Sequence, residues 1–375
     1  MKTKSIITII AAMAIMVFAQ NTGKACTGIM LKTKDGKTVS GRTLEFGVEV
    51  STSLVAVPEN YPFVGKTDNG DGLKYKSKYS MTGIITYKDM NIADGMNSAG
   101  LCSGAFYFPT FAKYTPLTKE NQNKALSPVD FNNWILARFA TVEEVKKAIN
   151  NNEVVIVPTV LKGWGTEAPP FHYIVYDKSG KSIVIEPING KLVVYDNPIG
   201  VLTNSPSFDW HMTNLRNYTY LKSENAGEMT INGVTFKQLG QGSGMYGIPG
   251  DFTPPSRFVR ATAFVVTALP TDNTVDAIKD VFHILNNFDI PKGFSREVVN
   301  GKIYPDYTQL TCARDPNTLK YYYKTYDNQT VKEFDLHSFN GNSKEILVIN
   351  TNEGNQTFEN VNKKMKPLKD YAKTK

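Results

Sequence analysis

Residues 23–28 join an apolar leader to a predicted β-strand, and this junction constrains the chain more than any other stretch. Lys2 and Lys4 precede an uncharged apolar run over residues 6–19, which has the length of a signal-peptide core and is too short for a typical membrane-spanning helix. We therefore expect residues 1–25 to be a signal peptide and the mature protein to be exported, as a periplasmic or secreted protein.

Cys26 becomes the first residue of the mature chain if the leader is cut directly before it. Cleavage after Ala19 also fits, and would leave residues 20–25 as a short propeptide. An N-terminal cysteine carries a thiol and a free amine with a pKa of about 7.7–8.0, so the amine can deprotonate the thiol near neutral pH. Lipidation of Cys26 is the alternative, but Lys24 and the lack of an aliphatic residue three positions before the cysteine make a poor lipidation signal.

The formal net charge of +7 is concentrated at the two ends of the chain. The leader contributes +3 and the tail 361–375 contributes +5, which leaves −1 on the body between them. Such a body cannot neutralise many phosphates, so we expect no nucleic-acid partner. After removal of the leader we also expect no stable insertion into a membrane.

The mature chain holds three cysteines, Cys26, Cys102 and Cys312. An odd count in an exported protein indicates at least one free thiol. A disulfide between Cys102 and Cys312 is one alternative, and we favour the other, two buried unpaired thiols. Neither a CxxC pair nor a His-rich spacing predicts a metal site, and the glycine-rich stretch 240–244 does not match a phosphate loop, so we expect no metal and no cofactor.

The sequence after Cys26 predicts a β-hairpin around Asp35-Gly36. A two-residue loop pairs positions whose numbers sum to 71, which sets Cys26 opposite Glu45 and turns Arg42 to the other face. A three-residue loop or one bulge changes the sum to 72, and Arg42 then shares the face of Cys26. Because Arg42 and Glu45 cannot both face Cys26 in a regular strand pair, we expect a bulge or a strand end there.

The remaining chain predicts a layered α+β architecture. Short alternating strands joined by tight turns over residues 171–203 predict an antiparallel meander, and residues 59–80 predict a long surface loop. Helical patterns follow Ser127, Thr141 and Thr253, at residues 128–139, 142–149 and 254–269, and a further amphipathic helix is predicted over residues 274–287. Neither a repeat nor a linker divides the chain, so we expect residues 26–375 to form a single domain.

Acyl transfer at Cys26 requires a base, an oxyanion hole and a cation near the sulfur. The free amine can supply the base, asparagine amides or turn N–H groups the oxyanion hole, and Arg42 or Arg257 the cation. Asn97 lies in a glycine-flanked turn, where a local backbone cap is the alternative role. The competing mechanism uses a histidine base, but His172 and His283 fall within strand and helix patterns, where histidines are usually structural.

Several motifs in the same order over nearly the whole mature chain resemble the choloylglycine hydrolase family, which contains conjugated bile salt hydrolases and penicillin V acylases. These motifs are Cys26-Thr-Gly-Ile, Gly41-Arg42, Asp94-Gly-Met-Asn97, Gly200-Val-Leu-Thr-Asn204-Ser-Pro, Phe208-Asp-Trp-His211, Gly250-Asp-Phe-Thr-Pro-Pro-Ser-Arg257-Phe and Phe282-His-Ile-Leu-Asn-Asn287.

The resemblance implies an N-terminal-nucleophile (Ntn) hydrolase with a four-layer αββα sandwich of two antiparallel sheets. By position, Cys26 matches the nucleophile, Arg42 the arginine near its sulfur, and Arg257 a second arginine of the site. Asn97, through its backbone N–H, and Asn204, through its side-chain amide, match the oxyanion hole. Glu45 stands where the family usually has an aspartate that contacts the free amine.

The implied activity is hydrolysis of the amide bond in glycine- or taurine-conjugated bile salts through a Cys26 thioester. Asn97 favours bile salts, because penicillin-preferring relatives often carry tyrosine at the matching position. The alternatives are a penicillin V acylase, an N-acyl homoserine lactone acylase, or a sterol- or acyl-binding protein without turnover if Cys26 stays blocked. Relatives also imply a homotetramer.

Overall fold

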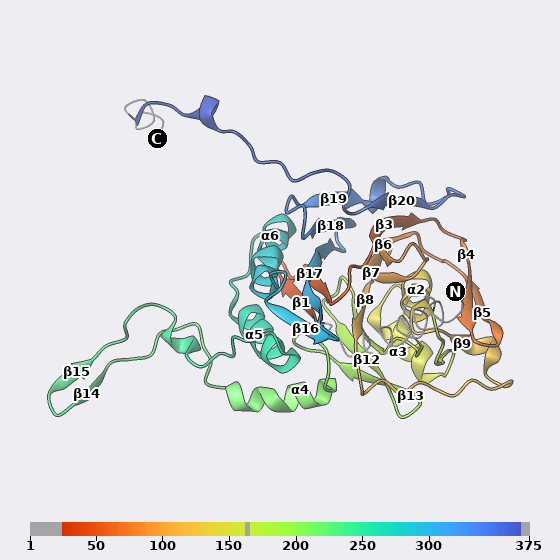
Figure 1. The fold of residues 1–375 in the computed structure, drawn as a ribbon, viewed down its shortest axis with the longest axis horizontal. Coiled ribbons are helices and arrows are strands. Elements are labelled where there is room, and N and C mark those ends of the chain that lie inside the picture. Colours follow the sequence, from red (N-terminus) through yellow and green to blue (C-terminus); the bar gives the residue numbers. More distant parts are fainter. Residues whose placement is uncertain (1–24, 162–165, 369–375) are drawn as a thin grey trace.

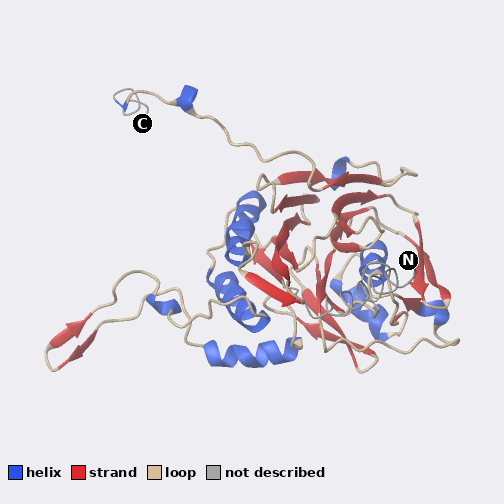
Figure 2. Ribbon diagram, viewed as in Figure 1, coloured by secondary structure: helices blue, strands red, loops and turns tan. Residues whose placement is uncertain are grey.

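The computed structural model of the chain describes residues 25–161 and 166–368 (Figure 1). The predicted leader and its cleavage junction, up to residue 24, lie outside the described residues. The body of the chain consists of two stacked antiparallel sheets with helices on their outer faces (Figure 2). This arrangement confirms the predicted α+β sandwich.

The first sheet begins with the strand that starts at Cys26. Its strand order is β1 (Cys26–Lys32), β2 (Thr38–Phe46), β17 (Lys302–Asp315), β18 (Lys320–Thr325) and β19 (Lys332–Asp335), and β16 (Ser295–Val299) pairs with β17 beside this path. The strand β1 therefore lies at an edge of its sheet.

The second sheet has eight strands and contains the predicted meander. Its order is β13 (Lys191–Asp196), β12 (Ser182–Ile188), β11 (Phe171–Tyr176), β8 (Cys102–Tyr107), β7 (Ile92–Asn97), β6 (Met81–Thr86), β3 (Thr52–Val57) and β20 (Leu347–Asn350). The last residues of the predicted meander, 200–203, do not form a strand of this sheet. Leu202 instead bridges to Gly28 of β1, which ties the loop after β13 to the edge of the first sheet.

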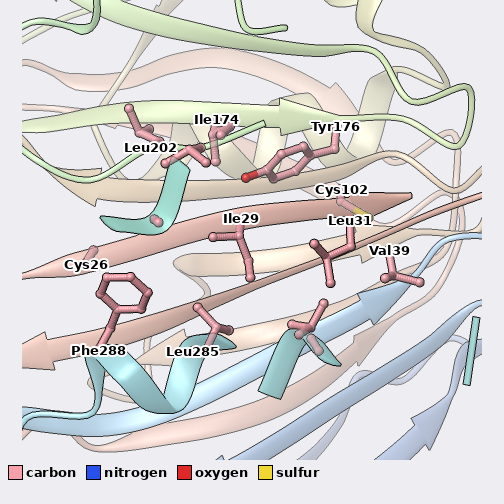
Figure 3. Packing of buried hydrophobic residues seen from close by; sticks show 14 of the residues in the cluster. Cys26, Ile29, Leu31, Val39, Cys102, Ile174, Tyr176, Leu202, Leu285 and Phe288 are labelled. Atoms are coloured by element: carbon pink, nitrogen blue, oxygen red, sulfur yellow. The ribbon is translucent and has the colours of Figure 1, made fainter. Parts of the chain in front are cut away.

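Helices α5 (Pro254–Thr267) and α6 (Thr274–Leu285) cover the first sheet, and α2 (Asp130–Arg138) and α3 (Val142–Asn150) cover the second. Figure 3 shows Leu285 and Phe288 on one side of β1 and Ile174 and Tyr176 of β11 on the other. Predicted capping residues begin two of these helices: the side chain of Thr141 accepts a backbone N–H group, and Thr253 precedes Pro254 of α5. The side chain of Asn273, a cap that was not predicted, accepts the N–H of Asp276 in α6.

Three shorter strand pairs and one helix lie outside these layers. They are β4 (Pro62–Thr67) with β5 (Gly70–Lys76), β9 (Ala125–Leu126) with β10 (Val155–Ile156), β14 (Met229–Ile231) with β15 (Val234–Phe236), and α4 (Phe208–Asn214). The segment 59–80, predicted as a surface loop, contains the hairpin of β4 and β5. Phe63 and Tyr75 stabilise this hairpin by stacking on each other across the strands, with ring centroids 5.2 Å apart. No helix among the described residues is long and apolar enough to cross a membrane.

The hairpin of β1 and β2 has a register that the sequence did not predict. Paired positions sum to 70, with Cys26 opposite Leu44, so both predicted sums are wrong. The turn consists of residues 34–36, closed by the Thr33 N–H bond to the carbonyl of Lys37, and Gly36 takes the left-handed φ of 83° as its last residue. Nevertheless Arg42 pairs with Gly28 and so shares the face of Cys26, as the second prediction required.

The expected irregularity near Glu45 is also present. Cys26 is the first residue of β1, and the pairing of β17 with β2 shifts register between Thr308 and Leu310, opposite Glu45 and Leu44. Arg42 and Glu45 are three positions apart in β2, so their side chains project from opposite faces of this strand. One face looks between the two sheets, and the other looks toward α5 and α6.

Close packing between β2 and α6 predicts sensitivity at Gly41. A Cβ atom at this position would lie 2.4 Å from Cγ1 of Val281 and 2.7 Å from the carbonyl oxygen of Cys312. We expect Gly41→Ala to lower the free energy of unfolding by about 1–3 kcal/mol, because the sheet and the helix must separate. Gly240→Ala is the control, since no atom lies within 4 Å of its Cβ. Urea unfolding of both variants tests this, and equal stabilities would contradict the packing argument.

Candidate active site

The Cys26 side chain is buried at the start of β1, in the space between the two sheets. Nη2 of Arg42 lies 2.7 Å from its sulfur, and the backbone N–H of Tyr107, the last residue of β8, also points to the sulfur. The sulfur borders a cavity. Most residues that line this cavity with Cys26 and Arg42 are apolar: Leu44, Phe46, Val50, Ile92, Ala93, Ala105, Val129 and Phe171. The site thus pairs a thiol and a guanidinium with room for an apolar group.

The Arg42 guanidinium is held by backbone carbonyls on three strands. Nε donates to the carbonyl of Thr43 at 3.2 Å, and Nη1 donates to the carbonyls of Ala105 at 2.7 Å and Ala93 at 3.4 Å. Its plane lies over the ring of Phe106, with 4.0 Å from Cζ to the ring centre. These contacts leave Nη2 directed at the sulfur.

Burial raises the pKa of the Cys26 thiol above its ordinary value. The Arg42 guanidinium opposes this rise most strongly, Glu45 adds to it, and Arg257 and the Tyr107 N–H oppose it. Because burial dominates, the thiol of the uncleaved chain is protonated at neutral pH and a base is needed before it can act as a nucleophile.

Asn204 follows the loop that Leu202 ties to β1. Its Oδ1 accepts from the backbone N–H of Cys26 at 2.9 Å and from Nη2 of Arg257 at 2.6 Å. Its Nδ2 donates to the carbonyl of Tyr107 at 2.8 Å. Asn204 therefore joins the nitrogen of Cys26, an arginine and the end of β8.

Arg257 lies in the first turn of α5, as the sequence predicted, and it is buried. Nη1 donates to the carbonyl of Cys26 and to Oγ1 of Thr27 at 2.9 Å, and Nε donates to the carbonyl of Phe252 at 2.8 Å. Burial lowers the pKa of Arg257, and the neighbouring Glu45 opposes that change. The hydrogen bonds of Arg257 thus fix the main chain of Cys26, whereas those of Arg42 reach its sulfur.

Glu45 is fully buried on the opposite face of β2 from Arg42. Its backbone N–H donates to the carbonyl of Ala25 at 3.0 Å, and its Oε1 accepts from Oγ1 of Thr308 at 2.9 Å. Its Oε2 is buried and has no hydrogen-bond partner within residues 25–161 and 166–368. Burial raises the pKa of Glu45 to about 8, and the nearby Arg257 opposes that rise.

Asn97 is the one predicted site residue that the fold does not bring to Cys26. It ends β7, its backbone N–H donates to the carbonyl of Leu101 at 3.0 Å, and its Oδ1 accepts from the N–H groups of Ala99 and Leu101. Its Nδ2 donates to the carbonyls of Leu136 and Phe139. Asn97 thus caps its own turn and ties it to α2, which is the alternative role considered above.

Tyr107 is the site residue that sequence reasoning missed. Its N–H points to the sulfur of Cys26, its carbonyl accepts from Asn204, and its side chain lines the cavity. The sequence gives no signal for it beyond its place in an apolar, strand-like stretch. A position in a strand does not indicate a catalytic role, because the backbone N–H group that reaches the sulfur is present in almost every residue type.

The other cysteines and the histidines stand apart from this chemistry. Cys102 and Cys312 are free and buried, which confirms the interpretation as unpaired thiols. No histidine in the described part of the chain hydrogen-bonds to Cys26, so the histidine-base mechanism gains no support. No group of three or more potential metal ligands occurs there either.

The chain matches the model of the linear amide C–N hydrolases, choloylglycine hydrolase family, over residues 26–349. The chain belongs to this family. It is 36% identical over 330 residues to the bile salt hydrolase/transferase of Clostridium perfringens, covering 87% of this chain and 97% of that protein. It is 25% identical to the penicillin V acylase of Pectobacterium atrosepticum, covering 80% of this chain and 78% of that one.

A solved structure supports the same assignment. A single-residue variant of the conjugated bile acid hydrolase from Clostridium perfringens superposes with a TM-score of 0.79 and 34% identity, covering 90% of this chain and 100% of that one. The protein is thus a linear amide C–N hydrolase of the choloylglycine hydrolase type with the Ntn-hydrolase fold.

The predicted export to the periplasm or the medium is wrong. The related bile salt hydrolases are typically cytoplasmic enzymes of Gram-positive bacteria. The prediction rested on the apolar composition of residues 6–19, which lie outside the described residues. Apolar composition reports how a segment partitions between water and apolar surroundings, and that property alone does not fix where an enzyme resides.

The raised pKa of Glu45 predicts how stability depends on pH in the uncleaved chain. Below about pH 4.5 the Glu45 carboxyl is protonated in both the folded and the unfolded chain. Between about pH 4.5 and 8 it ionises in the unfolded chain and stays protonated in the folded chain. Relative to Glu45→Gln, the free energy of unfolding should therefore fall by about 3–5 kcal/mol over this range. Urea titrations of both proteins at several pH values test this, and a difference that is constant with pH would contradict the protonated carboxyl.

Proposed function

We propose that this hydrolase cleaves the amide bond of glycine- or taurine-conjugated bile salts, with Cys26 as the nucleophile. The observation that carries the proposal is the 2.7 Å contact of Arg42 with the Cys26 sulfur at the border of an apolar cavity. Resemblance to a bile salt hydrolase over 97% of that protein's length supports the choice of substrate.

The proposed reaction begins after the residues before Cys26 are removed, which leaves residues 26–375 as one domain. The new α-amine takes the thiol proton, and the sulfur attacks the amide carbonyl carbon. The C–N bond then breaks, the amine product leaves with a proton, and the acyl group remains on sulfur as a thioester. Water attacks the thioester, releases the carboxylate and restores the thiol and the amine.

The oxyanion in this scheme lies between the backbone N–H of Tyr107 and the side-chain amide of Asn204. The Tyr107 N–H already points toward the sulfur, and one hydrogen of Asn204 Nδ2 remains after its bond to the Tyr107 carbonyl. Both donors sit in a buried site, where hydrogen bonds to a developing charge are strong. Asn97 has no part in the proposal.

Glu45 and Asn204 orient the free amine in the proposed mature enzyme. Oδ1 of Asn204 already accepts from the Cys26 nitrogen, and the buried Oε2 of Glu45 gains a cationic neighbour once the amine is exposed. Cleavage before Cys26 is thus an activation step. A blocked Cys26 would leave a binding protein without turnover.

A penicillin V acylase is the second candidate, and Tyr107 favours it. The expectation of bile salts rested partly on an asparagine in place of the tyrosine that penicillin-preferring relatives often carry. Since Tyr107 and not Asn97 presents its backbone N–H to Cys26, that argument now points to penicillin V. Sequence similarity weighs against it, at 25% identity to a penicillin V acylase compared with 36% to a bile salt hydrolase.

Direct comparison of substrates separates the two candidates. We expect protein that begins at Cys26 to release glycine from glycocholate and taurine from taurocholate at least tenfold faster than it hydrolyses penicillin V. Cys26→Ser should lower every rate by a factor on the order of 10³ or more, because an alcohol is far less acidic than a thiol. Turnover of penicillin V alone would exclude the bile salt proposal, and an active Cys26→Ser variant would exclude the nucleophile.

We also propose the homotetramer that the family resemblance implies. The hairpin β14–β15 projects from the body (Figure 1) and exposes Met229, Ile231, Val234 and Phe236. An isolated two-stranded hairpin is marginally stable in water, so an apolar hairpin of this kind favours burial against another subunit.

Light scattering tests the assembly. We expect the wild-type protein to have four times the subunit mass of 41.7 kDa before processing, and the double variant Ile231→Ser, Val234→Ser to shift to smaller species. Phe358→Ser, a change at an exposed residue far along the chain from the hairpin, is the control. A tetramer that survives the double substitution would place the interface elsewhere.

A further inference from the structure

Three buried ionisable residues that the proposed reaction does not use surround the loop that carries Asn204. They are His172 on β11, Glu186 on β12 and His211 on α4, and the exposed fraction of each is 0%. None of them lines the cavity beside Cys26. Burial of ionisable groups is unfavourable unless they are paired, so their contacts require an explanation.

His172 and Glu186 bind the chain on both sides of Asn204. Nε2 of His172 lies 3.1 Å from the carbonyl oxygen of Thr203, and Nδ1 lies 3.1 Å from Oε1 of Glu186. The same Oε1 accepts from the N–H of Phe208, the first residue of α4, at 2.9 Å. Because a carbonyl only accepts, Nε2 of His172 carries a proton, and a second proton lies between Nδ1 and Oε1.

His211 holds the next peptide group. Its Nε2 lies 2.9 Å from the carbonyl oxygen of Asn204, so Nε2 is the protonated nitrogen of the ring. Its Nδ1 is buried and has no hydrogen-bond partner in the described residues. Burial lowers the pKa of His211 to about 4, which agrees with a neutral ring that donates once.

Each histidine ring also stacks on a phenylalanine that directly follows a residue of the site in the sequence. His172 stacks on Phe108, next to Tyr107, with ring centroids 4.3 Å apart. His211 stacks on Phe258, next to Arg257, with ring centroids 4.6 Å apart. The two rings therefore connect the Asn204 loop to the end of β8 and to the start of α5.

We propose that His172, Glu186 and His211 are positioning residues that fix Asn204 against the Cys26 nitrogen, Arg257 and Tyr107. The inference rests on the proposed roles of Cys26 and Asn204. Two successive carbonyls, of Thr203 and Asn204, are each held by one ring, so the side chain of Asn204 can rotate little. Loss of either contact displaces the oxyanion donor and leaves the sulfur, Arg42 and the acyl cavity unchanged.

The test compares two substitutions at His211 in the mature enzyme. Glutamine places an amide nitrogen near the position of Nε2 and keeps a donor to Asn204, whereas asparagine is too short to reach it. We expect His211→Asn to lower kcat at least tenfold with KM within about twofold, and His211→Gln to recover most of kcat. His283→Asn, an exposed histidine of α6, is the matched control and should match the wild type.

Alkylation of Cys26 by iodoacetamide, followed by mass spectrometry, separates positioning from general damage. Alkylation needs the thiolate, and hence the amine that Asn204 contacts, but no oxyanion hole, so in His211→Asn its rate should fall far less than kcat. A loss of kcat with an equal loss of alkylation rate would indicate a merely structural role and overturn the inference. The inference would also be overturned if kcat of His211→Asn, calculated per molecule whose Cys26 can be alkylated, equals that of the wild type.

Glu186→Gln tests the inference if His211→Asn does not fold. The substitution keeps the size of the side chain and removes the carboxylate that accepts from Phe208 and faces His172, so we expect the same loss of kcat with a much smaller loss of alkylation rate. Failure of the proposed function has a different signature, since Cys26→Ser would then remain active. An inactive Cys26→Ser together with normal kcat in His211→Asn or Glu186→Gln would reject this inference alone.

Discussion

A charged guanidinium held between two sheets organises this protein. An unpaired charge in a protein interior is strongly unfavourable, so the Arg42 side chain is tolerated only where its N–H groups find acceptors. The carbonyls of Thr43, Ala93 and Ala105 provide them from β2, the start of β7 and β8. The register of β2 within the first sheet and the stacking of the second sheet over it must both be correct before Nη2 can meet the sulfur of Cys26.

The position of Cys26 at a strand end lets the two faces of the sheet act on one residue. Its sulfur lies between the sheets with Arg42, and its nitrogen and carbonyl are reached by Asn204 and by Arg257 from α5. Glu45 lies on the helix-facing side of β2 and contacts the residue before Cys26. A cysteine in the middle of a strand would have its nitrogen engaged in the ladder, and cleavage before it would cut the sheet.

Local patterns in the sequence predicted the layers, most helix starts and most of the residues that meet at Cys26, because capping boxes, alternating strands and short motifs act over a few positions. Two errors have different physical origins. The hairpin of β1 and β2 closes with a local turn at 34–36 whose position the sequence pattern did not determine, whereas the choice of Tyr107 over Asn97 depends on how strands far apart in the sequence stack. The motif around Asn97 marks a tight turn correctly, but only the contact between the sheets decides that β8 and not β7 ends at the sulfur.

Burial governs the protonation of Cys26 and Glu45 in the uncleaved chain. Burial raises the pKa of both Cys26 and Glu45, so at neutral pH the thiol is protonated and the carboxyl, with a pKa of about 8, is mostly protonated too. Cleavage before Cys26 would add an amine between them, and an ammonium beside Glu45 favours the carboxylate while its neutral form can take the thiol proton. A single change in covalent structure would thus alter the protonation of two buried groups, because at both of them the effect of burial outweighs that of the nearby guanidinium of Arg42 or Arg257.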